Sequence, residues 1–430
     1  MDVLRIAPAK AIRGRWLPPG DKSISHRAMI FGALAQGQTE IQKFLESDDC
    51  LRTAKICAQL GANVIRLAKG HWLIEGANGF KEPNDVLDCG NSGSSARMLA
   101  GPIAASGAYA VLTGDDSLRR RPMRRIADPL RAMGAKIEGR EEGSKMPLTI
   151  LGGNLKGIKW KLPIASAQVK TTILLAGLQA DGRTEVLEPY PSRDHTERML
   201  DAFGADLSIA ENGALTVEGG QTLHACDVRV PGDISSAAFL IVAALLLPDS
   251  ELLIRDLGLN ATRAGLLEVL TNSGAVFQFD RIDETAGEPI GALRIRSQPL
   301  RPITVMPDIV PRLVDEVPIL AVAATQAHGI SRFNGLSELR TKESDRLHAI
   351  STQLRRMGAQ IEADQDGLTI EGPVQLKSAE VESFGDHRIA MSLAIAGLLA
   401  RKGETIINGA ECIATSFPNF ARTLARLAVE

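Results

Sequence analysis

The chain has 430 residues, of which 44% are hydrophobic and 23% are charged, and its formal net charge at pH 7 is −2. This length allows two domains with sizeable cores, and the balanced charge excludes a general attraction to nucleic acid or to an anionic membrane. The five cysteines form no C-x-x-C pair, which favours free thiols in a reducing compartment over disulfides or a zinc site. The longest apolar run, Ala237–Leu247, is shorter than the ~20 residues that cross a bilayer. We therefore expect a cytoplasmic protein with neither a nucleic-acid partner nor a membrane partner.

Six apolar segments are predicted to form buried helices, because they are hydrophobic on all sides rather than on one face. In chain order they are Ser25–Gln36, Ser94–Ser106, Val169–Asp181, Ile234–Leu247, Val317–His328 and Arg388–Arg401. A short β-like run follows each of them, at Thr39–Gln42, Ala108–Thr113, Thr184–Leu187, Glu251–Arg255, Ser331–Asn334 and Glu404–Asn408. Five of the six junctions contain a glycine, at Gly37, Gly107, Gly182, Gly329 and Gly403. Glycine suits a left-handed helix C-cap, so we expect these helices to end there.

A second, more amphipathic helix is predicted between successive buried helices. It ends at Gly61, Gly134, Gly204, Gly274 and Gly358, at intervals of roughly 70 residues. The recurrence predicts six strand–helix–strand–helix units whose sheets wrap around central helices. Hinges are expected at Pro18–Gly20 and at Pro231–Gly232. Each segment combines proline, whose φ is fixed, with glycine, whose backbone is unrestricted. We therefore predict an α/β fold with one domain formed by residues 20–230 and the other by 1–19 plus 231–430.

A polar cluster precedes each predicted buried helix. The clusters are GDKSISHR from Gly20, GNSGSSAR from Gly90, SAQVK from Ser166, PGDISS from Pro231, RLVDE from Arg312 and GDHR from Gly385. Capping accounts for Ser, Asp and Asn at a helix start, but the positive end of the helix dipole repels Lys and Arg. Free backbone amides together with a cation form an anion site. Several such helix starts meeting at one place would bind a substrate with several negative charges.

Two further basic segments fit the same hypothesis. Ser117–Arg125 contains a dense arginine run that is too short for a nucleic-acid tail, and a solvated turn suffices to explain Arg119 and Arg120. Glu338–Arg346 places Lys342 and Arg346 four residues apart on one helical face. Its opposed charges are also compatible with a surface ion-pair network.

These motifs, together with SRDHTERM, the Arg312–Gln326 stretch, ELRTKESDR and TSFPNF, resemble the EPSP synthase family in their order along the chain. SAQVK and RDHTE resemble the second of its two bacterial classes, and the resemblance runs from Gly20 to Phe420. It implies a two-domain inside-out α/β barrel of six βαβαββ repeats, three per domain, with the active site in the interdomain cleft. The implied reaction transfers the enolpyruvyl group of phosphoenolpyruvate to the 5-hydroxyl of shikimate 3-phosphate and releases phosphate. It needs neither a metal nor another cofactor, and we expect a monomer.

The resemblance also implies the residues of the site. The shikimate 3-phosphate contacts are expected to be Lys22, Ser23, Arg27, Ser166, Gln168, Arg193, Asp315 and Lys342. The phosphoenolpyruvate contacts are expected to be Lys22, the backbone at Gly93, Arg121, Gln168, Arg346 and Arg388, with Ser94 nearby. Lys22, Asp315 and Glu343 are the candidate acid and base groups, with Asp315 acting at the 5-hydroxyl and the other two at the methylene carbon. His26, His195 and His387 also lie in these motifs, where structural and catalytic roles both remain open.

One position departs from part of the family. Some members have a lysine near the C-terminus that contacts phosphoenolpyruvate, whereas this chain has the neutral Thr415 there. The family is the target of glyphosate, which occupies the phosphoenolpyruvate position, and Gly93 lies where alanine in some members crowds the inhibitor. We therefore expect glyphosate to compete with phosphoenolpyruvate.

Three other functions are less consistent with the sequence. The sister transferase that acts on UDP-N-acetylglucosamine carries a reactive cysteine in the loop that corresponds to Ser117–Arg125, and this loop has none. A kinase or NTPase would need the G-x-x-x-x-G-K spacing, which GDKS at Gly20 lacks. A binding solenoid would not carry different charged residues at the same end of each repeat.

Overall fold

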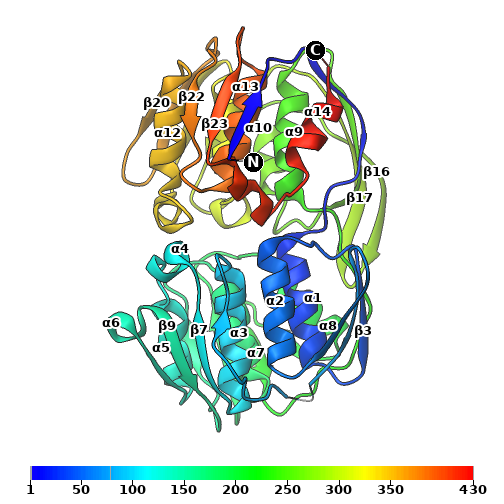
Figure 1. Cartoon of the computed structure of the whole chain (residues 1–430), viewed down its shortest axis with the longest axis vertical. Helices are drawn as coiled ribbons and strands as arrows, with labels where there is room; N and C mark the ends of the chain where they lie inside the picture. Colours follow the sequence, from blue (N-terminus) through cyan, green and yellow to red (C-terminus); the bar gives the residue numbers. More distant parts are fainter. Residues whose placement is uncertain (1, 78, 430) are drawn as a thin grey trace. The chain divides into compact units, whose positions relative to one another are not determined.

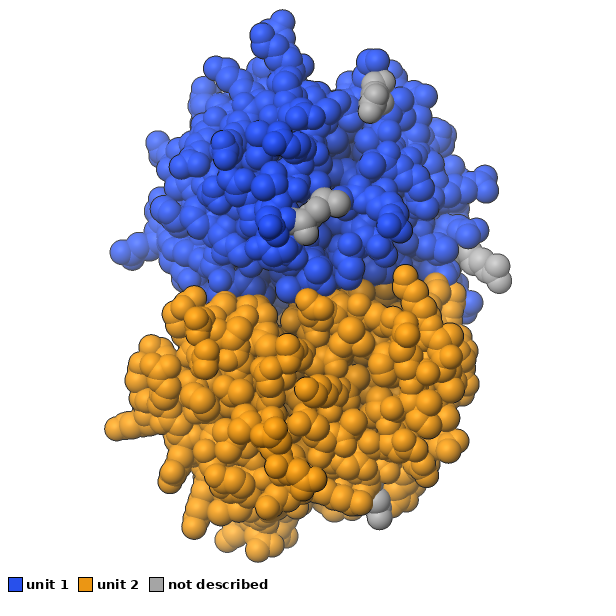
Figure 2. All heavy atoms as spheres, viewed as in Figure 1, with its two compact units in different colours: residues 1–19, 232–283, 289–430 blue, residues 20–231, 284–288 orange. Residues whose placement is uncertain are grey.

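The computed structural model describes residues 2–77 and 79–429, and the chain divides into two compact units (Figure 2). Unit 1 consists of the N-terminal segment to Pro19, Gly232–Asp283 and the segment from Pro289 onward. Unit 2 consists of Gly20–Pro231 and the short segment Glu284–Glu288. The last segment is the tip of a hairpin whose two strands belong mainly to unit 1.

Unit 2 contains three largely buried helices, which are α1 (Lys22–Leu34), α3 (Gly93–Ser106) and α7 (Ala167–Gly177). Its other helical segments are α2 (Asp48–Gln59), α4 (Asp116–Arg120), α5 (Arg124–Ala132), α6 (Arg140–Gly143) and α8 (His195–Ala202). The described strands form three four-stranded sheets. In spatial order the first is β14 (Val228–Arg229), β3 (Gln38–Gln42), β5 (His71–Glu75) and β4 (Asn63–Ala68). The second is β6 (Leu87–Asp88), β7 (Tyr109–Thr113), β9 (Lys145–Leu151) and β8 (Lys136–Gly139). The third is β10 (Lys159–Lys161), β11 (Arg183–Leu187), β13 (Leu215–Glu218) and β12 (Leu207–Ile209).

Unit 1 has a similar composition, with the buried helices α9 (Ile234–Leu246), α11 (Val317–Ala324) and α13 (His387–Leu398). Its other helices are α10 (Gly265–Asn272), α12 (Arg346–Arg356), α14 (Phe420–Leu427) and the 3-10 turns η1 (Val310–Arg312), η2 (Ser337–Thr341) and η3 (Ala410–Thr415). One sheet is β1 (Val3–Ile6), β23 (Thr405–Asn408) and β22 (Glu380–Glu382). A second is β16 (Gln278–Thr285), β17 (Glu288–Arg296), β15 (Glu251–Gly258), β2 (Ala11–Trp16) and β24 (Ala428–Val429). The third is β18 (Thr304–Val305), β19 (Gly329–Phe333), β21 (Leu368–Gly372) and β20 (Gln360–Ala363).

The sheets share one pattern of pairing. In the sheet of β6, β7, β9 and β8, the first pair is parallel and the other two are antiparallel. The same order of directions occurs in the sheets that contain β11 and β19. A parallel pair requires a crossover connection, and the buried helices α3, α7 and α11 supply it. The fold is therefore a mixed α/β fold in which the buried helices connect paired strands.

The close contact between α3 and α7 fixes the neighbouring starts of these two helices (Figure 1). A side chain at Gly101 would place its Cβ 2.1 Å from the carbonyl oxygen of Thr172, so only glycine allows this approach. Thr172 also donates its hydroxyl to the carbonyl oxygen of Arg97 at 2.7 Å. These contacts hold the polar first turns of α3 and α7 in a defined position.

The glycines predicted to end helices take their expected positions after the outer helices but not after most of the buried helices. Gly61, Gly134, Gly204, Gly274 and Gly358 all have positive φ and directly follow the C-cap residue of an outer helix, as predicted. Among the buried helices only α3 has its glycine, Gly107, as the C-cap itself. The predicted ends of α7 at Asp181 and of α11 at His328 are both wrong, because α7 stops at Gly177 and α11 stops at Ala324. At the end of α11 the Thr325 hydroxyl donates to the carbonyl oxygen of Val322 at 2.7 Å, an interaction that competes with helix continuation.

Candidate functional site

The starts of the buried helices in unit 2 are fixed by side-chain caps. Asp21 accepts from the amide of Ile24 at 2.9 Å, and Ser92 accepts from the amide of Ser95 at 3.1 Å. Such caps satisfy some of the first backbone amides of a helix and leave others available to a ligand. Gly93, whose backbone was predicted to contact phosphoenolpyruvate, is the first residue of α3 and directly follows its cap, Ser92.

The predicted catalytic residue Lys22 begins α1 and is half-buried. Its ammonium group forms an ion pair with Asp49 at the start of α2. Asp49 was not among the predicted site residues, because 27 positions separate the two and no spacing rule links them. The pair therefore holds an ammonium group at the helix start that the motif indicated.

The predicted phosphate ligand Arg27 is buried between α1, α7 and α8. Its Nε donates to the Thr196 hydroxyl at 2.8 Å, and its Nη2 donates to the Thr171 hydroxyl at 2.9 Å. Burial is the largest influence on its pKa, which falls from 12.5 to about 10, while nearby Glu197 opposes this and nearby Arg193 adds to it. Arg27 stays protonated at neutral pH, so this part of unit 2 carries two neighbouring arginines.

Gln168 connects α7 to α3 through two hydrogen bonds, one of them to Ser94, which was predicted to lie near phosphoenolpyruvate. Its side-chain oxygen accepts from Nη1 of Arg97 at 2.8 Å, and its nitrogen donates to the Ser94 hydroxyl at 2.9 Å. Arg97 is a functional candidate that the sequence analysis did not select, although it closes the GNSGSSAR motif. Its spacing from Gly93 could have identified it, because residues four positions apart in a helix lie on the same face.

Arg121 lies beside the same helix start. Its guanidinium donates to the backbone carbonyl of Asn91 at 3.1 Å, to the Asn91 side chain at 2.6 Å and to the Ser117 hydroxyl at 3.1 Å. A Cβ added at Gly93 would lie 2.9 Å from Nη1 of Arg97 and 3.4 Å from Nη1 of Arg121. The two guanidinium groups therefore flank the first turn of α3.

In unit 1, the predicted residue Arg346 is fully buried at the start of α12 and contacts three carboxylates with three different nitrogens. Nε donates to Asp386 at 2.8 Å, Nη1 to Asp315 at 3.0 Å and Nη2 to Glu343 at 2.7 Å. Burial alone would lower the pKa of Arg346, but the charges of Asp386, Glu343 and Asp315 outweigh it and raise this pKa. The structure thus brings both predicted catalytic carboxylates onto one guanidinium.

Arg388 belongs to a second buried network in unit 1. Its Nη1 lies 3.6 Å from Glu316, whose carboxylate also accepts from Arg263 at 3.3 Å and from the Ser235 hydroxyl. Asp233, the cap of α9, lies 3.5 Å from Arg263. Arg263 and Glu316 are further residues that the sequence analysis missed, because their partners come from distant segments.

Two remaining positions have local partners. Lys342 donates to Glu338 at 3.0 Å, an i,i+4 pair of the kind that the sequence left open. Thr415 donates its hydroxyl to the backbone carbonyl of Cys412 at 2.8 Å and carries no charge. Lys342 is thus placed near a carboxylate of its own turn, while Thr415 completes η3.

The buried histidine His26 is linked to two other helices of unit 2. Nδ1 of His26 lies 2.7 Å from the Thr53 hydroxyl, which in turn lies 2.6 Å from the Ser95 hydroxyl, so a polar chain links α1, α2 and α3. Burial, reinforced by the positive charges of Lys22 and Arg27, lowers the pKa of His26 well below 6.5. His26 is therefore neutral at physiological pH.

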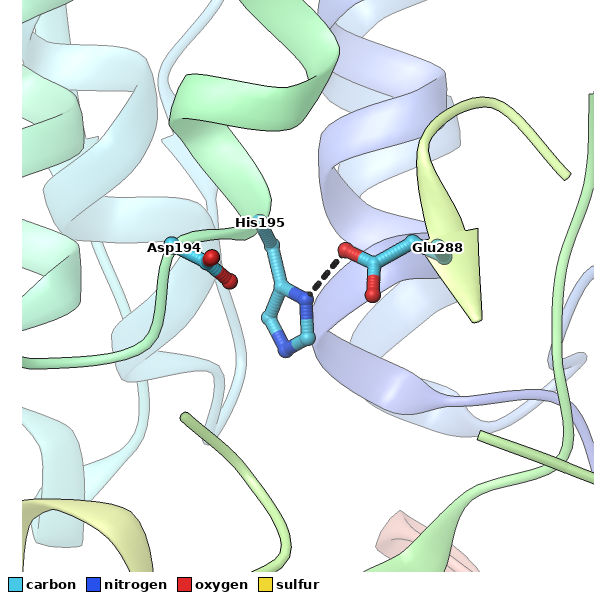
Figure 3. Close-up of side chains that lie close together, drawn as sticks. All are labelled: Asp194, His195 and Glu288. Atoms are coloured by element: carbon cyan, nitrogen blue, oxygen red, sulfur yellow. Dashed lines mark hydrogen bonds and ion pairs between the residues drawn. The ribbon is translucent and has the colours of Figure 1, made fainter. Parts of the chain in front are cut away.

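Three potential metal ligands also meet in unit 2, although their sequence positions gave no such spacing. Asp194, His195 and Glu288 offer ligand atoms within 4.8 Å of one another (Figure 3). Nδ1 of His195, however, lies 2.6 Å from Glu288, which is a direct hydrogen-bond distance. We interpret the group as a buried imidazole–carboxylate pair that attaches the hairpin tip to α8.

In the described residues, the predicted site residues therefore fall into two sets. The set in unit 2 is Lys22, Ser23, Arg27, Gly93, Arg121, Ser166, Gln168 and Arg193. The set in unit 1 is Asp315, Lys342, Glu343, Arg346 and Arg388. No helix in the described part of the chain combines the length and the apolar character that a membrane crossing requires.

Comparisons with known proteins agree over the whole length. A family model described as EPSP synthase (3-phosphoshikimate 1-carboxyvinyltransferase) matches residues 6–424. A 3-phosphoshikimate 1-carboxyvinyltransferase of Synechococcus sp. (strain JA-3-3Ab) is 50% identical over 430 residues, which cover 99% of this chain and 97% of the relative. The protein of the same name from Bacillus cereus (strain ATCC 10987) is 47% identical over 418 residues, with 97% of each chain covered.

Solved structures give the same result. The EPSP synthase of Acinetobacter baumannii has a TM-score of 0.88 at 42% identity, and the match covers 100% of this chain and 99% of that one. The enolpyruvyl transferase NikO from Streptomyces tendae has a TM-score of 0.78 at 19% identity, with 99% and 97% covered, which shows a shared fold alone.

Proposed function

The chain belongs to the EPSP synthase family, and we propose that the two sets of residues described above form its substrate sites. It is an enolpyruvyl transferase of the shikimate pathway: it transfers the carboxyvinyl group of phosphoenolpyruvate to the 5-hydroxyl of shikimate 3-phosphate and releases inorganic phosphate. The observation that supports the site assignment is the placement of cations at capped helix starts in both units.

The charge of the substrates fits this placement. Each phosphate monoester carries about −1.5 to −2 at pH 7, and each substrate adds a carboxylate. In our proposal Lys22, Ser23, Arg27, Ser166, Gln168, Arg193, Asp315 and Lys342 bind shikimate 3-phosphate. Arginine suits the phosphate because its guanidinium binds two oxygens at once. The two neighbouring arginines beside α8, Arg27 and Arg193, are the natural ligands for that group.

Phosphoenolpyruvate is assigned to the first turn of α3 and to the arginines of unit 1. Its contacts in this proposal are Lys22, the Gly93 backbone, Arg121, Gln168, Arg346 and Arg388. Arg97 is added to this set, because it donates to Gln168 and flanks Gly93. Backbone amides and guanidinium groups that are fixed before the reaction stabilise the phosphate as it departs.

The ion pairs also suggest how protons move. Asp315 and Glu343 both accept from Arg346, which holds the two carboxylates in fixed positions. We therefore assign Asp315 as the base at the 5-hydroxyl and Glu343 as the group that removes the methyl proton when the tetrahedral intermediate collapses. Lys22, an ammonium group paired with Asp49, is the candidate donor to the methylene carbon.

The architecture of the site is part of the proposal. We propose six βαβαββ repeats, three in each unit, and an active site in a cleft between the units, since each unit supplies only part of the required residues. Binding of shikimate 3-phosphate is then expected to close the cleft. Small-angle scattering tests this expectation, and an unchanged radius of gyration on addition of this substrate would contradict it. We further propose a monomeric enzyme in the cytoplasm, where free thiols such as Cys50 and Cys57 persist.

Phosphate release from phosphoenolpyruvate tests the assignment directly. Release is expected to require shikimate 3-phosphate and to fall by at least ~100-fold in Asp315→Ala and in Glu343→Ala, because general acid–base groups contribute about 10²–10⁴-fold. Glu362→Ala, which changes an exposed carboxylate of β20, serves as the matched control. Full activity of both site variants would refute the assignment of the acid and base groups.

A further inference from the structure

Lys170 is a buried charged residue of unit 2 that the proposed site does not use. It lies in the first turns of α7 and is 1% exposed. Its ammonium group donates to Glu188 at 2.8 Å and to Glu197 at 2.7 Å. Burial lowers the pKa of Lys170, but the charges of Glu197 and Glu188 and their hydrogen bonds outweigh this effect and raise it. A buried ion pair of this kind is weak evidence for added stability, so another role needs to be considered.

Glu188 connects Lys170 to two segments that carry proposed shikimate 3-phosphate ligands. One carboxylate oxygen accepts from the backbone amide of Ser166, the cap of α7, at 3.2 Å. The other accepts from the backbone amide of Ser192 at 3.2 Å, immediately before Arg193. Lys170 therefore holds a carboxylate that fixes both the start of α7 and the backbone that leads into α8.

Glu197 connects Lys170 to the arginines of the site. Its neighbour Thr196 accepts from Nε of Arg27 and lies 2.6 Å from the hydroxyl of Thr171, the residue after Lys170. The charge of Glu197 acts on Arg27. Among the described residues, one oxygen of Glu197 is buried without a hydrogen-bond partner. Lys170 is thus the cation that balances this carboxylate within the group.

The loss of Lys170 would change the electrostatics of the site. Glu188 and Glu197 would then be two buried carboxylates without their common cation, in the electrostatic neighbourhood of Arg27 and Arg193. Burial already raises the pKa of Glu197, so part of this charge would be neutralised by protonation. The negative charge that remains would attract these arginines and repel a phosphate dianion.

The proposed phosphoenolpyruvate cations have partners outside this group. In unit 2, Lys22 pairs with Asp49, and Arg121 donates to Asn91 and Ser117. In unit 1, Arg346 and Arg388 have carboxylate partners of their own. The effect should therefore fall mainly on one substrate.

We propose that Lys170 is a positioning residue that neutralises Glu188 and Glu197 and thereby keeps Arg27 and Arg193 available to the phosphate of shikimate 3-phosphate. The inference rests on the proposed assignment of that site. Lys170 itself would contact no substrate atom, and it would affect substrate specificity only through Arg27 and Arg193.

The test compares Michaelis constants in the full-length enzyme. Lys170→Met is expected to raise KM for shikimate 3-phosphate on the order of tenfold or more, because a charged group loses its hydrogen-bonded partner. In the same variant, KM for phosphoenolpyruvate is expected to change by less than about threefold. Lys170→Met combined with Glu197→Gln removes one of the two uncompensated carboxylates, the one whose charge acts on Arg27, and should restore part of the lost affinity. Lys161→Met, at an exposed position before α7, is the matched control.

Three results would overturn the proposal. These are an unchanged KM for shikimate 3-phosphate in Lys170→Met, an equal rise of both Michaelis constants, and the absence of rescue in the double variant. If Lys170→Met does not fold, as judged by its thermal unfolding, Lys170→Gln removes the same charge with a polar side chain and must show the same difference between substrates. Arg193→Gln separates this inference from the site assignment. If Arg193→Gln raises KM and Lys170→Met does not, only the role of Lys170 is refuted, whereas an unaffected Arg193→Gln refutes the site itself.

Discussion

The substitution Arg346→Lys probes the link between the guanidinium and the two proposed catalytic carboxylates. Arg346 uses a separate nitrogen for each of three carboxylates, at 2.7 to 3.0 Å. Lysine keeps the positive charge but has a single nitrogen on a flexible stem, so it cannot reproduce this fork. At least one contact, to Asp315 or to Glu343, should be lost, since Asp386 is the fully buried partner.

The size of the effect follows from that lost contact. A hydrogen bond to a charged group contributes about 1.5–3 kcal/mol, which corresponds to roughly 10- to 150-fold in rate. We therefore expect kcat/KM for phosphoenolpyruvate to fall by roughly this factor at saturating shikimate 3-phosphate. Because the carboxylates are no longer correctly placed, part of the loss should be in kcat.

The assay is steady-state phosphate release, with the thermal unfolding midpoint measured on the same samples. Arg356→Lys, an exposed substitution on the same helix α12, should leave both measurements unchanged. If Arg346→Lys retains kcat/KM within about twofold of the parent enzyme, a point charge suffices at this position, and the reasoning from the fork geometry is refuted.

Three further predictions concern other parts of the molecule. Gly93→Ala should raise KM for phosphoenolpyruvate and weaken competition by glyphosate, because the added Cβ would lie 2.9 Å from Nη1 of Arg97. Unchanged steady-state kinetics would contradict this reasoning, because the Arg97 side chain would then have moved away without cost. Inhibition by glyphosate that does not depend on the phosphoenolpyruvate concentration would contradict competition at this site. His26 resists protonation when folded, so acidification below pH 6.5 should favour the unfolded chain by up to about 1.4 kcal/mol per pH unit. Denaturant unfolding of His26→Gln should show a shallower loss between pH 6.5 and 5, and identical slopes would exclude His26 as the source. Burial raises the pKa of the Cys57 and Cys89 thiols, so neither should react with iodoacetamide at pH 7.5 until the protein is unfolded, and peptide mapping that found native-state labelling would contradict their burial.

The predicted elements agree with the structure where local chemistry defines them. The buried helix predicted at Ser94–Ser106 is observed at Gly93–Ser106, because Ser92 caps its start and Gly107 its end. The predicted helix Val317–His328 is four residues too long, since apolar character continues beyond the last helical turn. Hydrophobicity identifies a buried segment, but the hydrogen bonds of residues such as Thr325 decide where its helix stops.

The sequence alone determined where cations follow a capping residue, because a cap bonds to an amide two or three positions away and its signature is local. It indicated Lys22, Arg27 and Arg388 in this way, and it indicated Arg346 through its place in the basic segment Glu338–Arg346. Only the tertiary structure decided their partners, such as Asp49 for Lys22. Residues that are distant in the chain meet through packing of whole helices, and no local spacing records such a meeting. The same reason explains why Lys170, with its two carboxylates on other segments, became a candidate only in the folded chain.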